Sequence, residues 1–484
     1  MTKKLRIPTG AKAASVYVMA NFLSRGLAII TLPIFTRLLT TEQIGTVTLY
    51  NSWFALFSCL GTLSLTAGGF PVAMKEYEGC RRQYTSSVLT LTTLIACLFL
   101  FLYALNVRFW NDLTGLPTSL MVLIIVGLFL APAMDFWLAF ERYEYRYFAS
   151  AIVTSVSALI ASAASIAAVV FFSSHTGPTD LGEVRLIANY GIIYIIDAVI
   201  WLQILIRGRC FVNLDYWKFS LKLSLPLLGY SIASQVLSVS DRLMIGDMVG
   251  NSAVGIYGTV YSVASLFTVF WTAINSSFVP YMYQNIGKLN TKIKQISFSV
   301  LLFYSLMAVV VIYLAPEVLR ILATEEYCKA IYIMPPIAVG VFYTSVANMY
   351  SNILLYEKSS KHIMLAAAIA AIVNVLLNFI LIPKYGYMAA AYTTMFAYAV
   401  MLVVLFSFSN HVFMQKETKS LSEVYDNKGI IILVVAMPAV MMSGLLVYDY
   451  TFLRYLIVGI LTIIGLITGI KLYNKQRSPQ TGKN

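Results

Sequence analysis

Charged residues are scarce in this chain of 484 residues, of which only 11% are Asp, Glu, Lys or Arg. Soluble domains carry about 25%, so the shortage excludes an ordinary soluble fold. The 34 Lys and Arg outnumber the 21 Asp and Glu and give a net charge of +13. A nucleic-acid binder would gather such charge on one soluble surface. Here the basic residues lie in short segments between apolar runs, which argues against nucleic acid as a partner.

Histidine and cysteine are also few. The three histidines, His175, His362 and His411, are isolated from one another, so no nucleophile with a positioned base can be proposed. The five cysteines show neither metal-site nor disulfide spacing. We therefore expect no catalytic residues, no metal site and no cofactor.

Apolar residues are abundant, at 59% of the chain. About fourteen membrane helices of roughly 20 residues each would account for nearly all of them. The apolar runs predict an all-α integral membrane protein with helices near 13–38, 44–70, 85–105, 118–140, 149–172, 186–205, 223–248, 254–280, 296–314, 330–355, 363–383, 389–408, 430–447 and 453–472. The first run is too long for the core of a secretory signal, so we expect it to remain as a helix.

The distribution of Lys and Arg predicts the orientation. Twenty-five of the 34 lie in both tails and in one set of alternate loops, which we call the basic side, and seven lie on the opposite side. Cytoplasmic loops carry the excess of Lys and Arg. We expect a multi-pass protein with both termini in the cytoplasm.

An internal repeat is visible at a shift of 210 residues. LLTTEQIG at 38–45 then aligns with MVGNSAVG at 248–255, and the flanking apolar runs superpose. Six helices separate the copies, so both run in the same direction and a pseudo-twofold axis lies along the membrane normal, a design found in transporters. The predicted organisation is an N-lobe (1–206), an inter-lobe cytoplasmic loop (207–222), a C-lobe (223–408) and two added helices with a tail (409–484).

Three segments resemble the Wzx-type polysaccharide flippases of the MOP superfamily, which also contains the MATE exporters and the lipid II flippases. These are TRLLTTEQIG, SDRLMIGDMVG and IVNVLLNFILIPKYGYMAAAY. The third is the most specific, because Asn374, Asn378, Pro383, Gly386 and the alanines from Ala389 recur together in such flippases.

The resemblance implies a function. It is translocation of an undecaprenyl-diphosphate-linked oligosaccharide from the cytoplasmic to the outer leaflet of the bacterial inner membrane, for O-antigen, capsule or a related polymer. It implies alternating access driven by an ion gradient, with H⁺ or Na⁺ as the coupling ion. The implied partners are the lipid-linked glycan, membrane lipids and other polysaccharide assembly proteins.

Charges inside apolar runs are candidate site residues, because they are costly in a membrane and usually face protein or a watery cavity. Arg25 and Asp197 lie near the middle of their predicted helices, and Asp135 lies near the cytoplasmic end of its helix. On the functional interpretation Arg25 binds the lipid diphosphate and Asp197 or Asp135 binds the coupling ion. On the structural interpretation Arg25 and Asp197 pair to hold the N-lobe together. Both interpretations are open.

Structural or gating roles are expected for a second group of residues. Asp241 and Arg242, near the outer end of their helix, suggest a clamp. Asn374 and Asn378 share one helix face and suit interhelical hydrogen bonds better than a cavity lining. Pro33 can bend the first helix.

Two other functions remain open. A membrane-embedded enzyme that modifies polysaccharide would need a catalytic cluster in a large outer loop, and none is visible. A MATE-like exporter of small molecules would share the architecture, and the few central charges do not separate it from a flippase.

Overall fold

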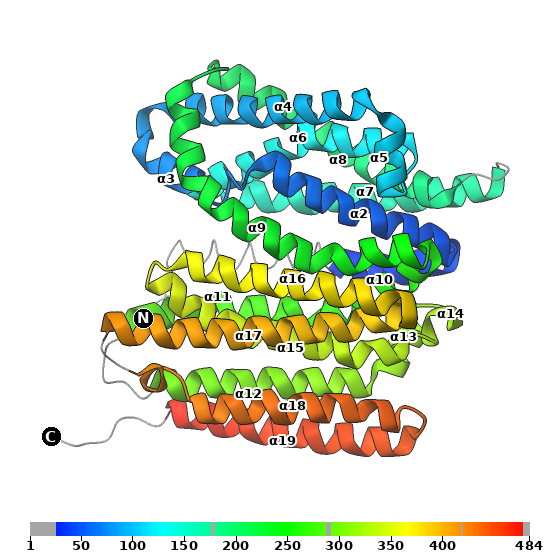
Figure 1. Ribbon diagram of the computed structural model, residues 1–484, viewed down its shortest axis with the longest axis vertical. Helices are drawn as coiled ribbons and strands as arrows, with labels where there is room; N and C mark the ends of the chain where they lie inside the picture. Colours follow the sequence, from blue (N-terminus) through cyan, green and yellow to red (C-terminus); the bar gives the residue numbers. More distant parts are fainter. Residues whose placement is uncertain (1–25, 176–179, 287–291, 418–419, 478–484) are drawn as a thin grey trace, which may run out of the picture. The chain divides into compact units, whose positions relative to one another are not determined.

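The computed structural model describes residues 26–175, 180–286, 292–417 and 420–477, and the regular structure in these ranges is helical (Figure 1). Eleven of its helices are long and apolar enough to cross a membrane, and two shorter apolar helices span Gly26–Leu38 and Thr451–Ile463. Together with α2 (Thr41–Thr62), they occupy the fourteen positions predicted from the sequence. The prediction of an all-α integral membrane protein is confirmed.

The order of helices repeats along the chain. The first series is α4 (Arg81–Leu105), the short α5 (Val107–Thr114), α6 (Thr118–Tyr143), α7 (Tyr147–His175) and α8 (Leu181–Gly208). About 210 residues later follow α12 (Lys292–Tyr313), the short α13 (Ala315–Leu322), α15 (Met334–Tyr356), α16 (Ser360–Tyr385) and α17 (Tyr387–Glu417). The short α14 (Glu325–Cys328) precedes α15, and α18 (Asn427–Val447) and α19 (Thr451–Arg477) follow the second series.

One helix that the sequence predicts as continuous is broken, and a second is interrupted at a single residue, Leu266, which keeps helical φ and ψ angles. The run 44–70 forms α2 and α3 (Gly69–Glu76), because Leu63 and Ser64 adopt positive φ angles of 47° and 54° and end α2. The run 254–280 forms α10 (Asn251–Ser265) and α11 (Phe267–Asn285). Apolar periodicity predicted the spans but not these interruptions.

Contacts divide the chain into two compact units, Met1–Gly258 (unit 1) and Thr259–Asn484 (unit 2). The long helix α9 (Leu214–Met248) thus groups with unit 1, whereas the repeat placed it in the C-lobe. Serine hydroxyls of α9 account for this: Ser220 bonds Tyr84 Oη (2.5 Å), Ser224 accepts from Gly69 N (3.0 Å), and Ser231 accepts from Ser64 (2.8 Å). The predicted lobe boundaries remain a prediction.

α9 is also bent, as Figure 1 shows, and it contains Pro226. Proline lacks the amide that would bond to the preceding turn and is a common cause of such kinks.

The aligned segments of the repeat meet within unit 1, where the first turns of α2 and α10 cross. A Cβ added to Gly45 would lie 1.9 Å from the carbonyl oxygen of Asn251, and one added to Gly255 would lie 2.0 Å from that of Thr41. Thr41 Oγ1 and Ser252 Oγ are 2.8 Å apart in a hydrogen bond. The glycines that the repeat aligns therefore allow backbone-to-backbone contact, as small residues do between membrane helices.

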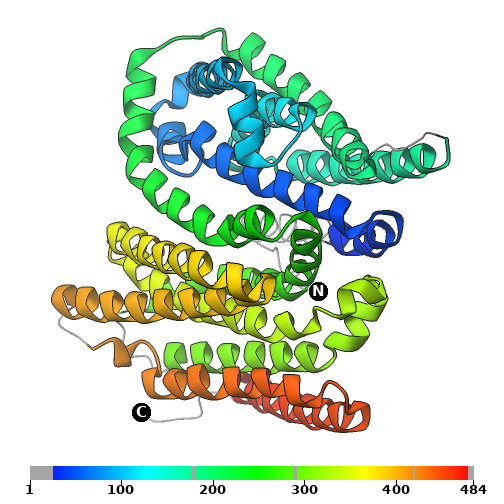
Figure 2. The same cartoon turned by 45° about the vertical axis from the view of Figure 1, so that its right-hand side comes forward.

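Unit 2 is built around α15. In the most apolar 18-residue stretch of this span, 78% of the residues are buried. α15 packs against α17 and α18, and α12, α18 and α19 lie side by side in both views (Figure 1, Figure 2). Lipid tails are as apolar as these side chains, so close packing and interhelical hydrogen bonds hold the helices together. Examples are Ser409 Oγ to Tyr350 O (2.9 Å) and Tyr425 Oη to Met349 O (3.0 Å).

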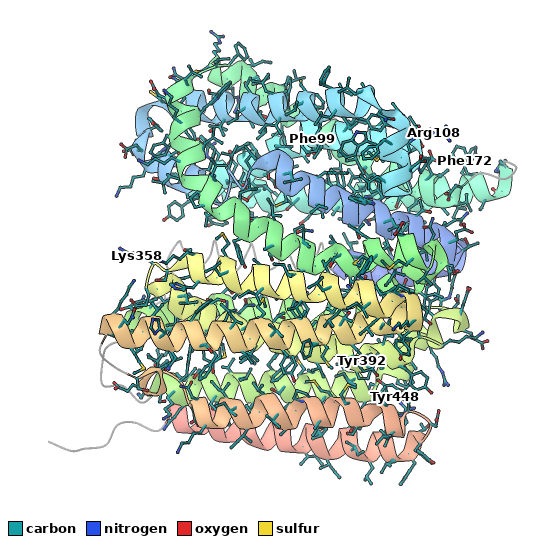
Figure 3. All side chains as sticks on the ribbon, in the orientation of Figure 1. Phe99, Arg108, Phe172, Lys358, Tyr392 and Tyr448 are labelled. Atoms are coloured by element: carbon teal, nitrogen blue, oxygen red, sulfur yellow. The ribbon has the colours of Figure 1, made fainter. Side chains whose placement is uncertain are left out.

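The loops of unit 2 fit the predicted alternation of sides. Lys358, which follows α15, and Tyr448, which follows α18, lie at opposite ends of this unit (Figure 3). The sequence predicts the first on the basic side and the second on the other.

Candidate functional site

α8 carries one polar face through an otherwise apolar span of unit 1. Tyr190, Tyr194 and Asp197 follow one another at spacings of four and three residues, which places them on the same side of the helix. That side packs against α6 and α2. The three side chains therefore point into the protein.

Tyrosines link α8 to α2. The hydroxyls of Tyr194 and Tyr50 are 3.2 Å apart in a buried hydrogen bond, and Tyr190 donates to Oδ1 of Asn51 at 2.8 Å. The ring of Tyr50 lies 5.0 Å from that of Tyr190. Gly127 of α6 leaves room for this group, because a Cβ there would lie 2.2 Å from the Tyr194 hydroxyl.

Asp197 is 1% exposed, and its Oδ1 is buried with no hydrogen-bond partner among the described residues. An unpaired buried carboxylate is costly in a medium of low dielectric constant. The site is therefore suited to a carboxyl that takes up a proton or a cation. Tyr194, on the preceding turn, is close enough to Asp197 to interact with it electrostatically.

Asp135, on the neighbouring helix α6, is a second carboxyl close to Asp197. Asp135 is exposed, and the two groups repel each other electrostatically. Two like charges near each other favour binding of a proton or cation by one of them. The structure thus brings together the two residues that the sequence proposed as alternatives.

A cavity of about 280 Å³, the N-unit cavity, adjoins the tyrosines. Its walls come from helix Gly26–Leu38 and from α2, α7 and α8, and its polar lining residues are Thr31, Asn51, Ser162, Ser165, Arg185, Asn189 and Tyr190. The guanidinium of Arg185 lies 3.7 Å from the centroid of the Phe35 ring, which fixes it at the wall. Amide, hydroxyl and guanidinium groups suit a ligand rich in hydroxyl or phosphate oxygens.

Two of the predicted residues belong to the first apolar run of the sequence. Arg25 lies outside the described residues. Pro33 lies within helix Gly26–Leu38, and its carbonyl oxygen accepts a hydrogen bond from Arg37 Nη1 at 3.0 Å.

Of the remaining predicted residues, Asp241 belongs to unit 1, and Asn374 and Asn378 belong to unit 2. Asp241 is 1% exposed, accepts a 2.5 Å hydrogen bond from Tyr257 of α10, and accepts another from the backbone amide of Arg242. Asn374 and Asn378 of α16 are fully buried. Asn374 donates to Thr394, Asn378 donates to Asn374, and Asn378 accepts from Thr393.

Sequence reasoning missed Tyr50, Tyr194 and Gly127. The spacing of Tyr190 and Tyr194 before Asp197 was a usable signal on α8. Nothing in the sequence linked that face to Tyr50, 144 residues away.

A sequence profile of a family described as polysaccharide biosynthesis protein matches residues 11–286, more than half of the chain. The chain belongs to this family. A second profile, that of MatE, matches residues 226–380. No curated protein matches this family member in sequence.

Solved structures share the fold. The lipid II flippase MurJ in an inward closed conformation is 15% identical with a TM-score of 0.68, and the match covers 95% of this chain and 99% of MurJ. An inward-facing multidrug resistance MATE transporter of the MOP superfamily is 12% identical with a TM-score of 0.60, covering 83% and 96%. A MOP superfamily transporter from Pyrococcus furiosus is 13% identical with a TM-score of 0.55, covering 84% and 96%.

These comparisons confirm the resemblance to the MOP superfamily that the sequence motifs indicated. The neighbours named here are a flippase and two transporters.

Proposed function

We propose that the protein flips undecaprenyl-diphosphate-linked oligosaccharides from the cytoplasmic to the outer leaflet of the bacterial inner membrane by alternating access. The observation that carries the proposal is the match to the polysaccharide biosynthesis family over residues 11–286. A fold shared along nearly the whole chain with a flippase of lipid II supports a lipid-linked substrate. The polar lining of the N-unit cavity, with Arg185, Asn51 and Asn189, supports a substrate rich in oxygen atoms.

The test is flipping by the purified protein in liposomes. A fluorescent undecaprenyl-diphosphate oligosaccharide is placed in both leaflets, and a membrane-impermeant quencher reports the fraction that reaches the outer leaflet. Faster exchange than in protein-free liposomes, and none with a plain phospholipid probe, is the expected result. Equal rates with and without protein would refute the proposal.

The coupling ion is H⁺ or Na⁺, bound at Asp197 with Asp135 beside it. The buried, unpartnered Oδ1 of Asp197 supports this role. Asp197→Asn keeps the shape of the side chain and removes its charge, so we expect it to lower the rate of flipping under an imposed ion gradient at least tenfold. Asp241→Asn should lower the same rate less. Asp112→Asn, which removes an equal charge from an exposed residue of α5, is the inert control. If an imposed ion gradient accelerates flipping by Asp197→Asn as much as flipping by the control, Asp197 does not bind the coupling ion.

Arg25 is the proposed ligand of the substrate diphosphate. Arg25→Lys keeps a cation without the two-pronged geometry, so it should retain part of the flipping activity, while Arg25→Ala should abolish it at normal protein abundance. If Arg25→Ala instead lowers abundance, and the double change with Asp197→Ala restores it, the two residues form a structural pair.

A second candidate function is export of small cations, favoured by the MatE profile match at residues 226–380. The same liposomes loaded with a cationic dye test it. Dye export without movement of the glycolipid would support this alternative.

A further inference from the structure

A small pocket at the basic-side ends of α4, α6 and α8, separate from the carboxyl pair, gathers three arginines: one from α4, one from α8 and one from the loop between α6 and α7. Arg82, Arg146 and Arg207 line it with Glu141, and the remaining lining residues are Thr85, Trp137, Phe140, Gln203 and Ile204. We call it the arginine pocket. Its volume is about 50 Å³. A water molecule occupies about 30 Å³ of liquid, so the pocket has room for one small oxyanion group and not for an oligosaccharide.

Positive charge dominates the arginine pocket. Glu141 is the one carboxylate among its lining residues; it is 6% exposed and lies 3.8 Å from Arg146. Among the described residues, Arg82 and Arg207 have no ion pair within 4.0 Å, although Glu141 is close enough to Arg207 to attract it. Arg146 also lies 3.7 Å from Glu144, so both nearby carboxylates pair with Arg146, and the charges of Arg82 and Arg207 are the ones left without an ion pair in the described part of the chain.

Tight backbone packing holds two of these arginines together. Gly208 lets the end of α8 approach the first turn of α4 so closely that a Cβ there would lie 2.5 Å from the carbonyl oxygen of Arg82. Arg207 precedes Gly208 directly, and Arg209 ends the helix with a positive φ of 51°. Like charges held near each other repel. An anion bound between the two guanidinium groups would offset this repulsion.

Part of the wall of the pocket is apolar. Trp137, Phe140 and Ile204 supply it, and the pocket lies where three membrane spans end. Tryptophan is typical of the membrane interface, and arginine forms two parallel hydrogen bonds to phosphate oxygens. We propose that the arginine pocket binds the phosphate of an anionic membrane phospholipid, with the lipid chain leaving along the apolar wall.

Lipid binding by the purified full chain tests this, measured by native mass spectrometry with phosphatidylglycerol and with phosphatidylcholine of the same acyl chains. We expect phosphatidylglycerol to bind about tenfold more tightly. One lost charge-assisted hydrogen bond weakens binding by about tenfold or more, so Arg207→Gln and Arg82→Gln should each remove most of the preference. Arg207→Lys should give an intermediate value, since it keeps the charge without the paired donors.

Arg209→Gln is the matched control, because it removes the same charge two residues away from a side chain that does not line the pocket. It should leave the preference unchanged. Equal losses for Arg209→Gln and Arg207→Gln, or no preference in the parent protein, would overturn the proposal. Displacement of the lipid by an equal concentration of inorganic pyrophosphate would assign the pocket to a soluble phosphate and overturn the lipid assignment. If Arg207→Gln elutes as aggregate, Arg82→Gln, whose exposed side chain lies in the first turn of α4, decides the outcome.

Discussion

Replacing Gly255 by alanine should force apart the crossing of α2 and α10. The added Cβ would lie 2.0 Å from the carbonyl oxygen of Thr41, whereas ordinary contact begins near 3.4 Å, so the backbones must separate locally by about 1.4 Å. A backbone oxygen cannot rotate away as a flexible side chain can. We expect the substitution to destabilise the packed crossing by about 3 kcal/mol, the upper end of the range for overpacked sites. This free energy would shift an equilibrium between packed and separated helices about 150-fold toward separation.

A disulfide reports the crossing directly. Thr41 Oγ1 and Ser252 Oγ are 2.8 Å apart, so cysteines at these two positions, in a background lacking the five free cysteines, should cross-link readily on mild oxidation. Adding Gly255→Ala should greatly reduce the cross-linked fraction. Gly191→Ala is the control, because its Cβ in α8 would have no neighbour within 4 Å.

Cross-linking of Gly255→Ala as complete as that of Gly191→Ala, together with unfolding at the same temperature, would contradict this prediction. A large loss of folded protein without a change in cross-linking of the remainder would also contradict it, since the strain would then act on folding and not on the crossing.

Two further predictions concern unit 2. Glu317 accepts a 2.7 Å salt bridge from Arg454, which is 3% exposed. Burial raises the pKa of Glu317, but hydrogen bonds from Arg454 and Tyr455 and from its own backbone outweigh this and lower the pKa below its usual 4.5. The pair therefore stabilises the protein above about pH 4.5, and this contribution is lost as the pH falls through the lowered pKa. Glu317→Gln should lower stability by about 1–3 kcal/mol at neutral pH and flatten the acid limb of a melting-temperature profile; an unchanged profile would contradict this. Asn378→Leu should cost about 0.6–1.7 kcal/mol in thermal unfolding, the range for hydrogen bonds between membrane helices, and adding Thr393→Val should recover most of it; additive losses would show that the two residues are not coupled.

The residue pattern alone was enough to identify an all-α membrane protein, the positions of its apolar helices and the flippases that it resembles. Lipid cannot satisfy backbone amides, so a spanning segment that satisfies its own backbone groups must be a helix, and apolar helices are visible as runs of about 20 residues. It also marked Asp135 and Asp197, because a charge inside such a run is rare enough to stand out. The repeat aligned Gly45 with Gly255, without showing that the two segments touch.

Which helix faces meet was not readable from the sequence and became visible in the folded structure. A buried face and a lipid-facing side are both apolar in a membrane helix, so the sequence gives little information about the rotation of a helix about its axis. The hydrogen bond between Tyr50 and Tyr194, and the burial of Asp197 beside the exposed Asp135, depend on that rotation. The convergence of Arg82, Arg146 and Arg207 depends on it as well, since in the sequence these arginines are indistinguishable from the other basic residues of the same loops. Close approach at glycines such as Gly208 fixed the arrangement, because backbone contacts leave little freedom to rotate.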